Sequence, residues 1–193
     1  MRKVLFLLVL LVPVIVSAQV QTYPWDLTLF GGEATFCDEA GCFGPSGWAA
    51  GGAFGRQFTD RLSFELDGTY ARTSEILPSR IDTFTGQFYT PELQRRRFWA
   101  GLTFLVSVAS FGEASNFFIS LGGVFAYEHQ DLIVPEGVFA PDKTLGLKGG
   151  ISGGAGMNLW FSKSWGVRPE VRFYAVASPL SGIRYTGGLI HRF

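Results

Sequence analysis

The sequence predicts an all-β protein, an eight-stranded antiparallel up-and-down β-barrel that spans a membrane and is preceded by a cleavable signal peptide. Three observations predict this fold. Stretches of the chain alternate between apolar and polar residues, the connections between them alternate between short and long, and the chain is rich in glycine and aromatic residues. The chain has 25 Gly and 19 Phe, and few stretches have helical periodicity, which favours sheets over helices.

The first residues have the pattern of a secretory signal. Arg2 and Lys3 precede a short apolar run, and Val16-Ser17-Ala18 resembles a signal-peptidase site. A permanent membrane anchor is the alternative, but the run is too short and has the wrong flanks for a spanning helix. We therefore expect residues 1–18 to be a signal peptide, and residues 19–193 to form one barrel domain outside the cytoplasm.

The charge of the mature chain gives no reason to expect a nucleic-acid partner. The predicted signal holds two basic residues and no acidic one, so the remainder has a formal net charge of −2. The glycine-rich stretch at 146–156 lacks the GxxxxGK[ST] pattern of a phosphate-binding loop. We expect no cofactor.

Eight stretches have the alternation of strands, and most are at or above the ~9–11 residues that a tilted strand needs to cross a bilayer. In the stretch from Leu62, for example, Leu66 and Tyr70 share one face, and Glu65 and Asp67 share the other. The expected strands are 25–36, 47–58, 62–73, 94–107, 116–128, 145–161, 165–177 and 182–193.

The connections between these stretches differ in length. Short joins at 59–61, 108–115 and 162–164 follow the second, fourth and sixth strands. Longer joins at 37–46, 74–93 and 129–144 follow the first, third and fifth strands, and only the short join at 178–181 breaks the rule. Short turns at one end and long loops at the other are typical of transmembrane barrels.

Alternation alone does not separate this barrel from a soluble, lipocalin-like barrel in the periplasm, since both alternate along each strand. The volume of the apolar set favours the membrane protein, because an eight-stranded barrel has an interior only just wide enough for side chains. We therefore place the rings outward, in lipid. They include Phe64, Tyr70, Phe98, Phe104, Phe117, Phe125, Phe161 and Phe173.

The end of the chain, Tyr185-Thr-Gly-Gly-Leu-Ile-His-Arg-Phe193, adds a family resemblance. With the predicted signal, strand count and loop asymmetry, it resembles the small eight-stranded outer-membrane barrels of Gram-negative bacteria, the group of the OmpA membrane domain and OmpX. The resemblance implies a location in the outer membrane and contact with its lipid. It also implies that Tyr185, Leu189 and Phe193 form the signal read by the barrel-assembly machinery, although Gly187 and His191 do not fill the apolar pattern.

The charged faces of the strands predict the contents of the lumen. Charges removed from water must be paired, or they cost several kcal/mol each. We therefore expect a salt-bridge network that plugs the lumen, with Asp26 and Arg192 near its periplasmic mouth; a narrow pore for small solutes is the alternative. The network is expected to contain Glu65, Asp67, Lys148, Arg168, Glu170, Arg172 and Arg184.

Candidate chemistry is sparse. Cys37 and Cys42 are close together in a predicted loop of a secreted protein, so we expect them to form a disulfide rather than a metal site. Eight-stranded barrels that modify lipid A use a histidine with a nearby serine, but Asp131 occupies the position two residues after His129. We therefore expect no enzymatic activity, and we assign no catalytic or metal-binding residue.

The residues at the predicted long-loop end of the barrel indicate where it contacts other molecules. Loops 74–93 and 129–144 carry exposed apolar residues, which either bind an extracellular ligand or pack on each other. Arg95, Arg96 and Arg97 lie at the predicted outer rim, where lipopolysaccharide presents phosphates that arginine binds well. We expect a monomeric barrel with a structural or adhesion-like role.

Overall fold

A computed structural model describes residues 24–37, 46–81, 86, 88–111, 115–134, 143–177 and 181–193. The predicted signal peptide, residues 1–18, lies outside this part of the chain. Within the part that is described, no helix has the length and apolarity needed to cross a membrane.

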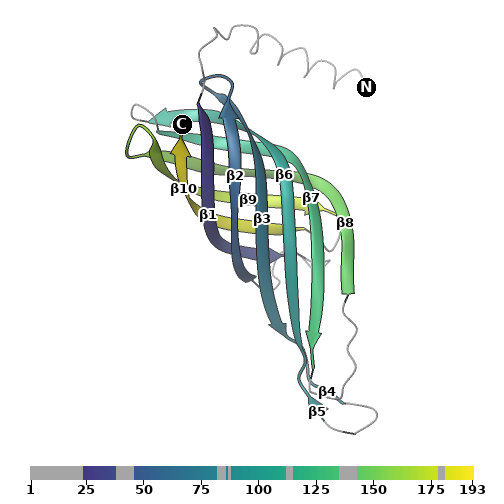
Figure 1. The fold of residues 1–193 in the computed structure, drawn as a ribbon. Helices are drawn as coiled ribbons and strands as arrows, with labels where there is room; N and C mark the ends of the chain where they lie inside the picture. The colour runs from purple at the N-terminus through teal and green to yellow at the C-terminus, as the bar shows by residue number, and fades with distance from the viewer. Residues whose placement is uncertain are drawn as a thin grey trace, which may run out of the picture.

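Eight strands form one closed antiparallel barrel, in the order β1-β10-β9-β8-β7-β6-β3-β2 (Figure 1). The predicted fold class is therefore confirmed. A separate pair of two-residue strands, β4 and β5, forms a hairpin at one end. The bounds are β1 Trp25–Phe36, β2 Ser46–Gln57, β3 Leu62–Ile76, β4 Arg80–Ile81, β5 Phe88–Tyr89, β6 Glu92–Phe111, β7 Ser115–Ile133, β8 Lys143–Trp160, β9 Trp165–Val176 and β10 Gly182–Arg192.

The first and last strands close the barrel along their whole length. Their pairing runs from Asp26 opposite Arg192 to Phe36 opposite Gly182. The backbones of Trp25 and Phe193 also exchange two hydrogen bonds, with N···O distances of 3.1 and 3.0 Å. The backbone N–H and C=O of Phe193 are thus both paired within the sheet. The seam between β1 and β10 leaves no unpaired strand edge.

The two faces of each strand differ as the alternation predicts. In β9, Arg168, Glu170 and Arg172 are buried inside the barrel, whereas Val167 and Phe173 are exposed on the outside. Exposed rings and aliphatic side chains cover the outer wall, which is the surface that lipid solvates in a membrane barrel. The predicted outward position of the rings holds for Phe98, Phe104 and Phe125 among others.

Four strands are longer than predicted. β3, β6, β7 and β8 have 15, 20, 19 and 18 residues, whereas each of the other four has 11 or 12. They run past the rest of the barrel towards the hairpin of β4 and β5 (Figure 1). Parts of the predicted loops 74–93 and 129–144 are therefore sheet. The sequence hides this extension because the segments just beyond the predicted strands, such as 74–75 of β3 and 129–131 of β7, are polar on both faces, so the contrast between the faces is lost there.

Candidate functional site

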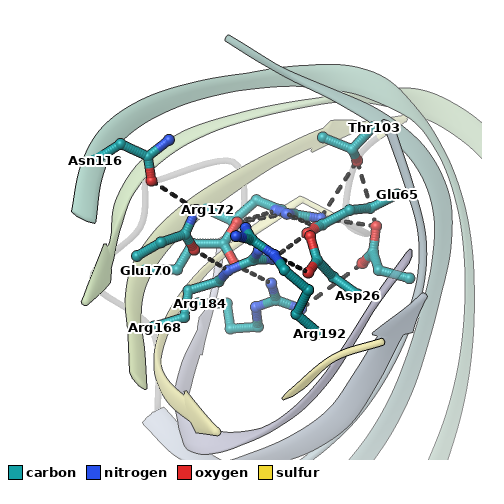
Figure 2. A network of polar contacts seen from close by, with 11 residues as sticks. Asp26, Glu65, Thr103, Asn116, Arg168, Glu170, Arg172, Arg184 and Arg192 are labelled. Carbon is teal, nitrogen blue, oxygen red and sulfur yellow. Dashed lines mark hydrogen bonds and ion pairs between the residues drawn. The ribbon is translucent and has the colours of Figure 1, made fainter. Parts of the chain in front are cut away.

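The lumen holds a cluster of charged side chains from three strands (Figure 2). We call it the charge cluster, and it consists of Glu65 and Asp67 from β3, Arg168, Glu170 and Arg172 from β9, and Arg184 from β10. All six side chains are almost completely buried. Three carboxylates and three guanidinium groups give the cluster no formal net charge.

Arg172 is the centre of the charge cluster. Its Nη1 lies 2.7 Å from Oδ1 of Asp67, and its Nη2 and Nε lie 2.5 and 2.7 Å from Oε1 of Glu170. Nη2 is also 3.7 Å from Oε2 of Glu65, and Nη1 donates to the hydroxyl of Thr103 at 3.3 Å. One guanidinium thus joins three carboxylates across the lumen, and its planar fork suits this arrangement better than a lysine would.

Arg168 extends the cluster towards the short-turn end of the barrel. Its Nη1 is ion-paired with Oε1 of Glu65, and its Nε donates to Oδ1 of Asn158 at 2.7 Å. The amide of Asn158 donates in turn to Oδ1 of Asn116 at 2.9 Å. The guanidinium of Arg168 also lies over the ring of Phe118, 5.3 Å from its centroid.

Arg184 extends the cluster in the other direction. Its Nη2 is 3.3 Å from Oε2 of Glu170, its Nη1 is 3.8 Å from Oδ2 of Asp67, and it donates to the hydroxyl of Thr69. The guanidinium lies 4.2 Å from the ring centroid of Phe30. Each arginine of the cluster therefore has a carboxylate partner, and two of them also pack on a ring.

A layer of rings follows the charge cluster towards the long-loop end. The rings of Trp99 and Tyr174 are stacked, and Phe36 meets Trp99 edge-on with centroids 5.8 Å apart. All three side chains are buried, and we call them the ring layer. We expected charged and small residues to fill the lumen, so this part of the prediction was incomplete.

Glycines on the inner wall make room for rings in the lumen. A Cβ atom at Gly156 would lie 2.6 Å from the ring of Phe118, and one at Gly182 would lie 3.0 Å from the ring of Trp99. The glycine content of the strands and their inward rings are therefore two parts of the same packing arrangement.

A second buried ion pair closes the lumen beyond the ring layer. The side chains of Arg97 and Glu128 both have 0% exposure, and Nε of Arg97 lies 2.6 Å from Oε2 of Glu128. Nη1 of Arg97 donates to the backbone oxygen of Ser181 at 2.7 Å, and the guanidinium lies 3.9 Å from the ring centroid of Phe36. This pair is not among the charged residues that the sequence led us to expect in the lumen.

The three predicted rim arginines therefore do not share one surface. Arg97 is inside the barrel, and Arg95 lies on the same face of β6, where its Nη2 is 3.6 Å from Oε2 of Glu75. Only Arg96 points outward, with its side chain 45% exposed and paired with Asp131. Adjacent residues of a strand point to opposite faces, so three arginines in sequence cannot form one outer patch.

Lys148 does not join the charge cluster. It lies on the inward register of β8, but it is exposed. The reason is the unequal length of the strands: the pairing of β8 with β9 begins only at Gly150 opposite Val176. Lys148 thus lies beyond the last residue of β9 that pairs with β8, where the wall no longer surrounds it.

The short-turn end of the lumen is open as a polar cavity of about 320 Å³. Asp26 and Arg192 lie at this mouth as predicted, with Oδ1 and Nε 3.2 Å apart. The cavity reaches Arg168 and Asn158, which belong to or contact the charge cluster. Water can therefore enter from this end as far as the cluster.

The other predicted sites lie on the surface or outside the described residues. Tyr185, Leu189 and Phe193 are exposed on the outer wall of the last strand. Cys37 is buried, but Cys42 lies outside the described part of the chain, and so do 82–85, 87 and 135–142 of the predicted ligand loops. The Cys37–Cys42 disulfide stays a prediction. Within the described residues, no group of three or more His, Cys, Asp and Glu side chains is arranged to hold a metal ion.

No model of a known protein family matches the chain, and no curated protein matches it in sequence. Solved structures do match its fold. Neisserial surface protein A has a TM-score of 0.62 at 10% identity, covering 88% of this chain and 97% of that one. The outer membrane protein OprG of Pseudomonas aeruginosa has a TM-score of 0.56 at 14% identity, covering 89% and 97%.

A third similar structure is Ail, the attachment invasion locus protein of Yersinia pestis, solved in complex with the heparin analogue sucrose octasulfate. It has a TM-score of 0.54 at 9% identity, and the match covers 90% of this chain and all of that one. At these identities the likeness shows the fold alone. The chain has the fold of the small outer-membrane β-barrels of Gram-negative bacteria.

Proposed function

We propose that the protein is an integral outer-membrane β-barrel with a closed lumen and a structural or surface-interaction role. The observation that carries this proposal is the filling of the lumen by the charge cluster, the ring layer and the Arg97–Glu128 pair, one after another along the barrel. An eight-stranded barrel has little interior to spare, and these three layers occupy it.

The energetics of the charge cluster favour the closed state. Opening a path would separate buried ions from their partners, and leaving one buried charge unpaired costs about 3–5 kcal/mol. The ring layer presents mostly apolar ring faces, and its polar groups are the hydroxyl of Tyr174 and the indole N–H of Trp99. A permeant ion would therefore lose more water than these two groups can replace.

A narrow pore for small solutes is the competing function, and the polar cavity at the short-turn end favours it. Single-channel recording in planar bilayers tests the two. We expect no steady conductance from the folded protein at either polarity, with an open porin as the positive control in the same bilayer. A steady, large conductance from protein that migrates as folded would contradict the closed lumen.

The long-loop end supports the interaction role. Ile76 and Phe88 are each 77% exposed there, and Ile81 of the hairpin is 55% exposed. Exposed apolar side chains grouped at the tip of an extended sheet are typical of contact surfaces. The partner would meet loops 74–93 and 129–144.

A deletion strain tested for adhesion and for envelope permeability separates this role from transport. We expect adhesion to fall and permeability to stay unchanged, and we expect the double variant Ile76→Ser/Phe88→Ser to reproduce the adhesion loss. Phe161→Ser, an exposed ring at the opposite end, is the matched control. Normal adhesion in the deletion strain would contradict the interaction role.

The proposal includes no catalysis and no oligomer. Overexpression should leave the mass spectrum of lipid A unchanged, and light scattering of the detergent-folded protein should give the mass of one chain. New acylation states of lipid A would contradict the first expectation.

A further inference from the structure

Three basic side chains form a row across the outer wall, which we call the cation row: Arg72 of β3, Arg96 of β6 and His129 of β7. The sheet register pairs Arg72 with Arg96, and Arg96 with His129. Residues directly opposite on neighbouring strands have Cβ atoms about 4.5–5.5 Å apart. The two guanidinium groups can therefore reach one anion from adjacent strands.

Rings mark the depth of the cation row in a membrane. Two residues nearer the short-turn end, Tyr70, Phe98 and Tyr127 form a parallel row on the same outer face. All three rings are exposed, and tyrosines on the outer wall of a barrel lie where hydrocarbon meets head groups. Two residues along a strand span about 7 Å, so the cation row lies just outside the hydrocarbon, at the level of lipid phosphates.

The two arginines keep most of their hydrogen-bonding capacity. Among the described residues, Arg72 donates to Oε1 of Gln94 at 2.5 Å, and Arg96 is paired with Asp131. Each guanidinium carries five N–H donors, and both side chains face outward. Donors thus remain on each arginine for an external anion.

Asp131 and Thr144 hold the row in place. Oδ1 of Asp131 is 2.7 Å from Nε2 of His129, and Oγ1 of Thr144 is 3.1 Å from Nδ1. Asp131 also pairs with Arg96, so one carboxylate orients two members of the row. With His129 counted as neutral, the row and Asp131 together carry a formal charge of +1.

On β3, β6 and β7 the outward carboxylates lie farther from the membrane than the arginines, and Glu33 of β1, at the depth of the row, is separated from Arg72 by Trp48 of β2. The next row outward is Ser74, Gln94 and Asp131, and the row beyond it has Glu92 between Ile76 and Ile133. Positive charge next to the rings and negative charge beyond them suit a lipid whose phosphates lie at the bilayer surface.

We propose that Arg72 and Arg96 bind a phosphate group of lipopolysaccharide in the outer leaflet. This rests on the proposed location in the outer membrane. Arginine binds phosphate through paired, charge-assisted N–H···O bonds, which two arginines on adjacent strands can make to one group.

Native mass spectrometry of the detergent-folded protein with diphosphoryl lipid A tests the proposal. We expect Arg72→Gln/Arg96→Gln to bind at least about tenfold more weakly than the wild type, because the variant loses both guanidinium groups that donate charge-assisted hydrogen bonds to the phosphate. Arg56→Gln is the matched control: Arg56 is an exposed outer-wall arginine near the opposite end, over the ring of Trp25. Its variant should bind as the wild type does.

Dephosphorylated lipid A separates the phosphate from the acyl chains. It should bind the wild type as weakly as diphosphoryl lipid A binds the double variant. Undiminished binding by a double variant that still migrates as folded, or an equal loss in Arg56→Gln, would overturn the proposal. Cell fractionation tests the membrane location separately. If the protein fractionates with the outer membrane but the double variant still binds lipid A as the wild type does, only the phosphate site is contradicted.

Discussion

Trp99 of β6 and Tyr174 of β9 stack face to face inside the barrel, with ring centroids 4.6 Å apart and planes 4° apart. Their strands are not neighbours, since β7 and β8 lie between them in the barrel wall. The stack therefore joins two sides of the lumen. Phe36 of β1 contacts Trp99 edge-on, which links a third strand to the stack. Backbone hydrogen bonds hold each strand only to its neighbours, so this ring layer supplies cross-links that the sheet cannot.

Replacing Trp99 should destabilise the barrel strongly. Trp99→Ala removes a fully buried ring from a closed lumen, and the cavity cannot collapse because the wall is a complete sheet. We expect a loss of about 3–5 kcal/mol in the free energy of unfolding, measured by urea titration in lipid vesicles with gel migration as the readout. Trp48→Ala, at a tryptophan 52% exposed on the outer wall, should lose clearly less. Equal losses would show that the ring layer has no special role.

The Arg97–Glu128 pair predicts a non-additive double mutant. Arg97→Met or Glu128→Leu alone leaves one buried charge without its partner, which should cost about 3–5 kcal/mol. The double variant should lose less than the sum of the two single losses, as the same urea titration would show.

Arg96→Met provides the control for the neighbouring position. Its side chain is 45% exposed, and its pair with Asp131 is on the surface, so the expected loss is at most about 1 kcal/mol. Additive losses at positions 97 and 128 would show that the two side chains do not depend on each other for stability.

The strands and the charge cluster were predictable because alternation reports which side chains share a face. The same rule could have placed Arg97 correctly: Phe98 was assigned outward, so Arg97 had to point inward with Trp99. Glu128 follows in the same way from the outward ring of Tyr127. Arg95, Arg96 and Arg97 are consecutive in the sequence, but the geometry of a strand places consecutive residues on opposite faces.

Other features were beyond the reach of local patterns. The exposure of Lys148 depends on where β9 stops relative to β8, and no pattern within β8 contains that information. The inward rings were also hidden, because Phe30 and Phe118 have room only where glycines of other strands face them. Phe30, for instance, fills the space next to Gly51, where a Cβ would lie 2.8 Å from its ring.

The pairing of glycines with rings predicts which glycines resist substitution. At Gly51, a Cβ would also lie 2.1 Å from the backbone oxygen of Gly68, and neither the sheet nor Phe30 can move away easily. Gly51→Ala should therefore lower the free energy of unfolding by about 1–3 kcal/mol. At Gly123 a Cβ would meet nothing within 4 Å, so Gly123→Ala should change stability little. Equal effects at both positions, measured by urea titration in vesicles, would contradict this packing account.

Phe193 predicts a difference between assembly in cells and stability in vitro. Its ring is 61% exposed on the outer wall, where it stacks on His191 and Phe54 with centroids 5.9 and 6.3 Å apart. Its backbone carries the closing hydrogen bonds with Trp25, and a substitution by alanine keeps them. Phe193→Ala should therefore fold in detergent to the same extent as the wild type.

In cells, Phe193→Ala should reach the outer membrane at a level several times lower, because the assembly machinery is expected to recognise the ring before the barrel closes. Phe161→Ala is the control, since this ring is 67% exposed and lies at the same end of the barrel, in the turn between β8 and β9. Its outer-membrane level should stay near that of the wild type, as quantified by immunoblots of membrane fractions. A normal level for Phe193→Ala, or an equal drop for both variants, would show that Phe193 serves the barrel only as one interfacial ring among many.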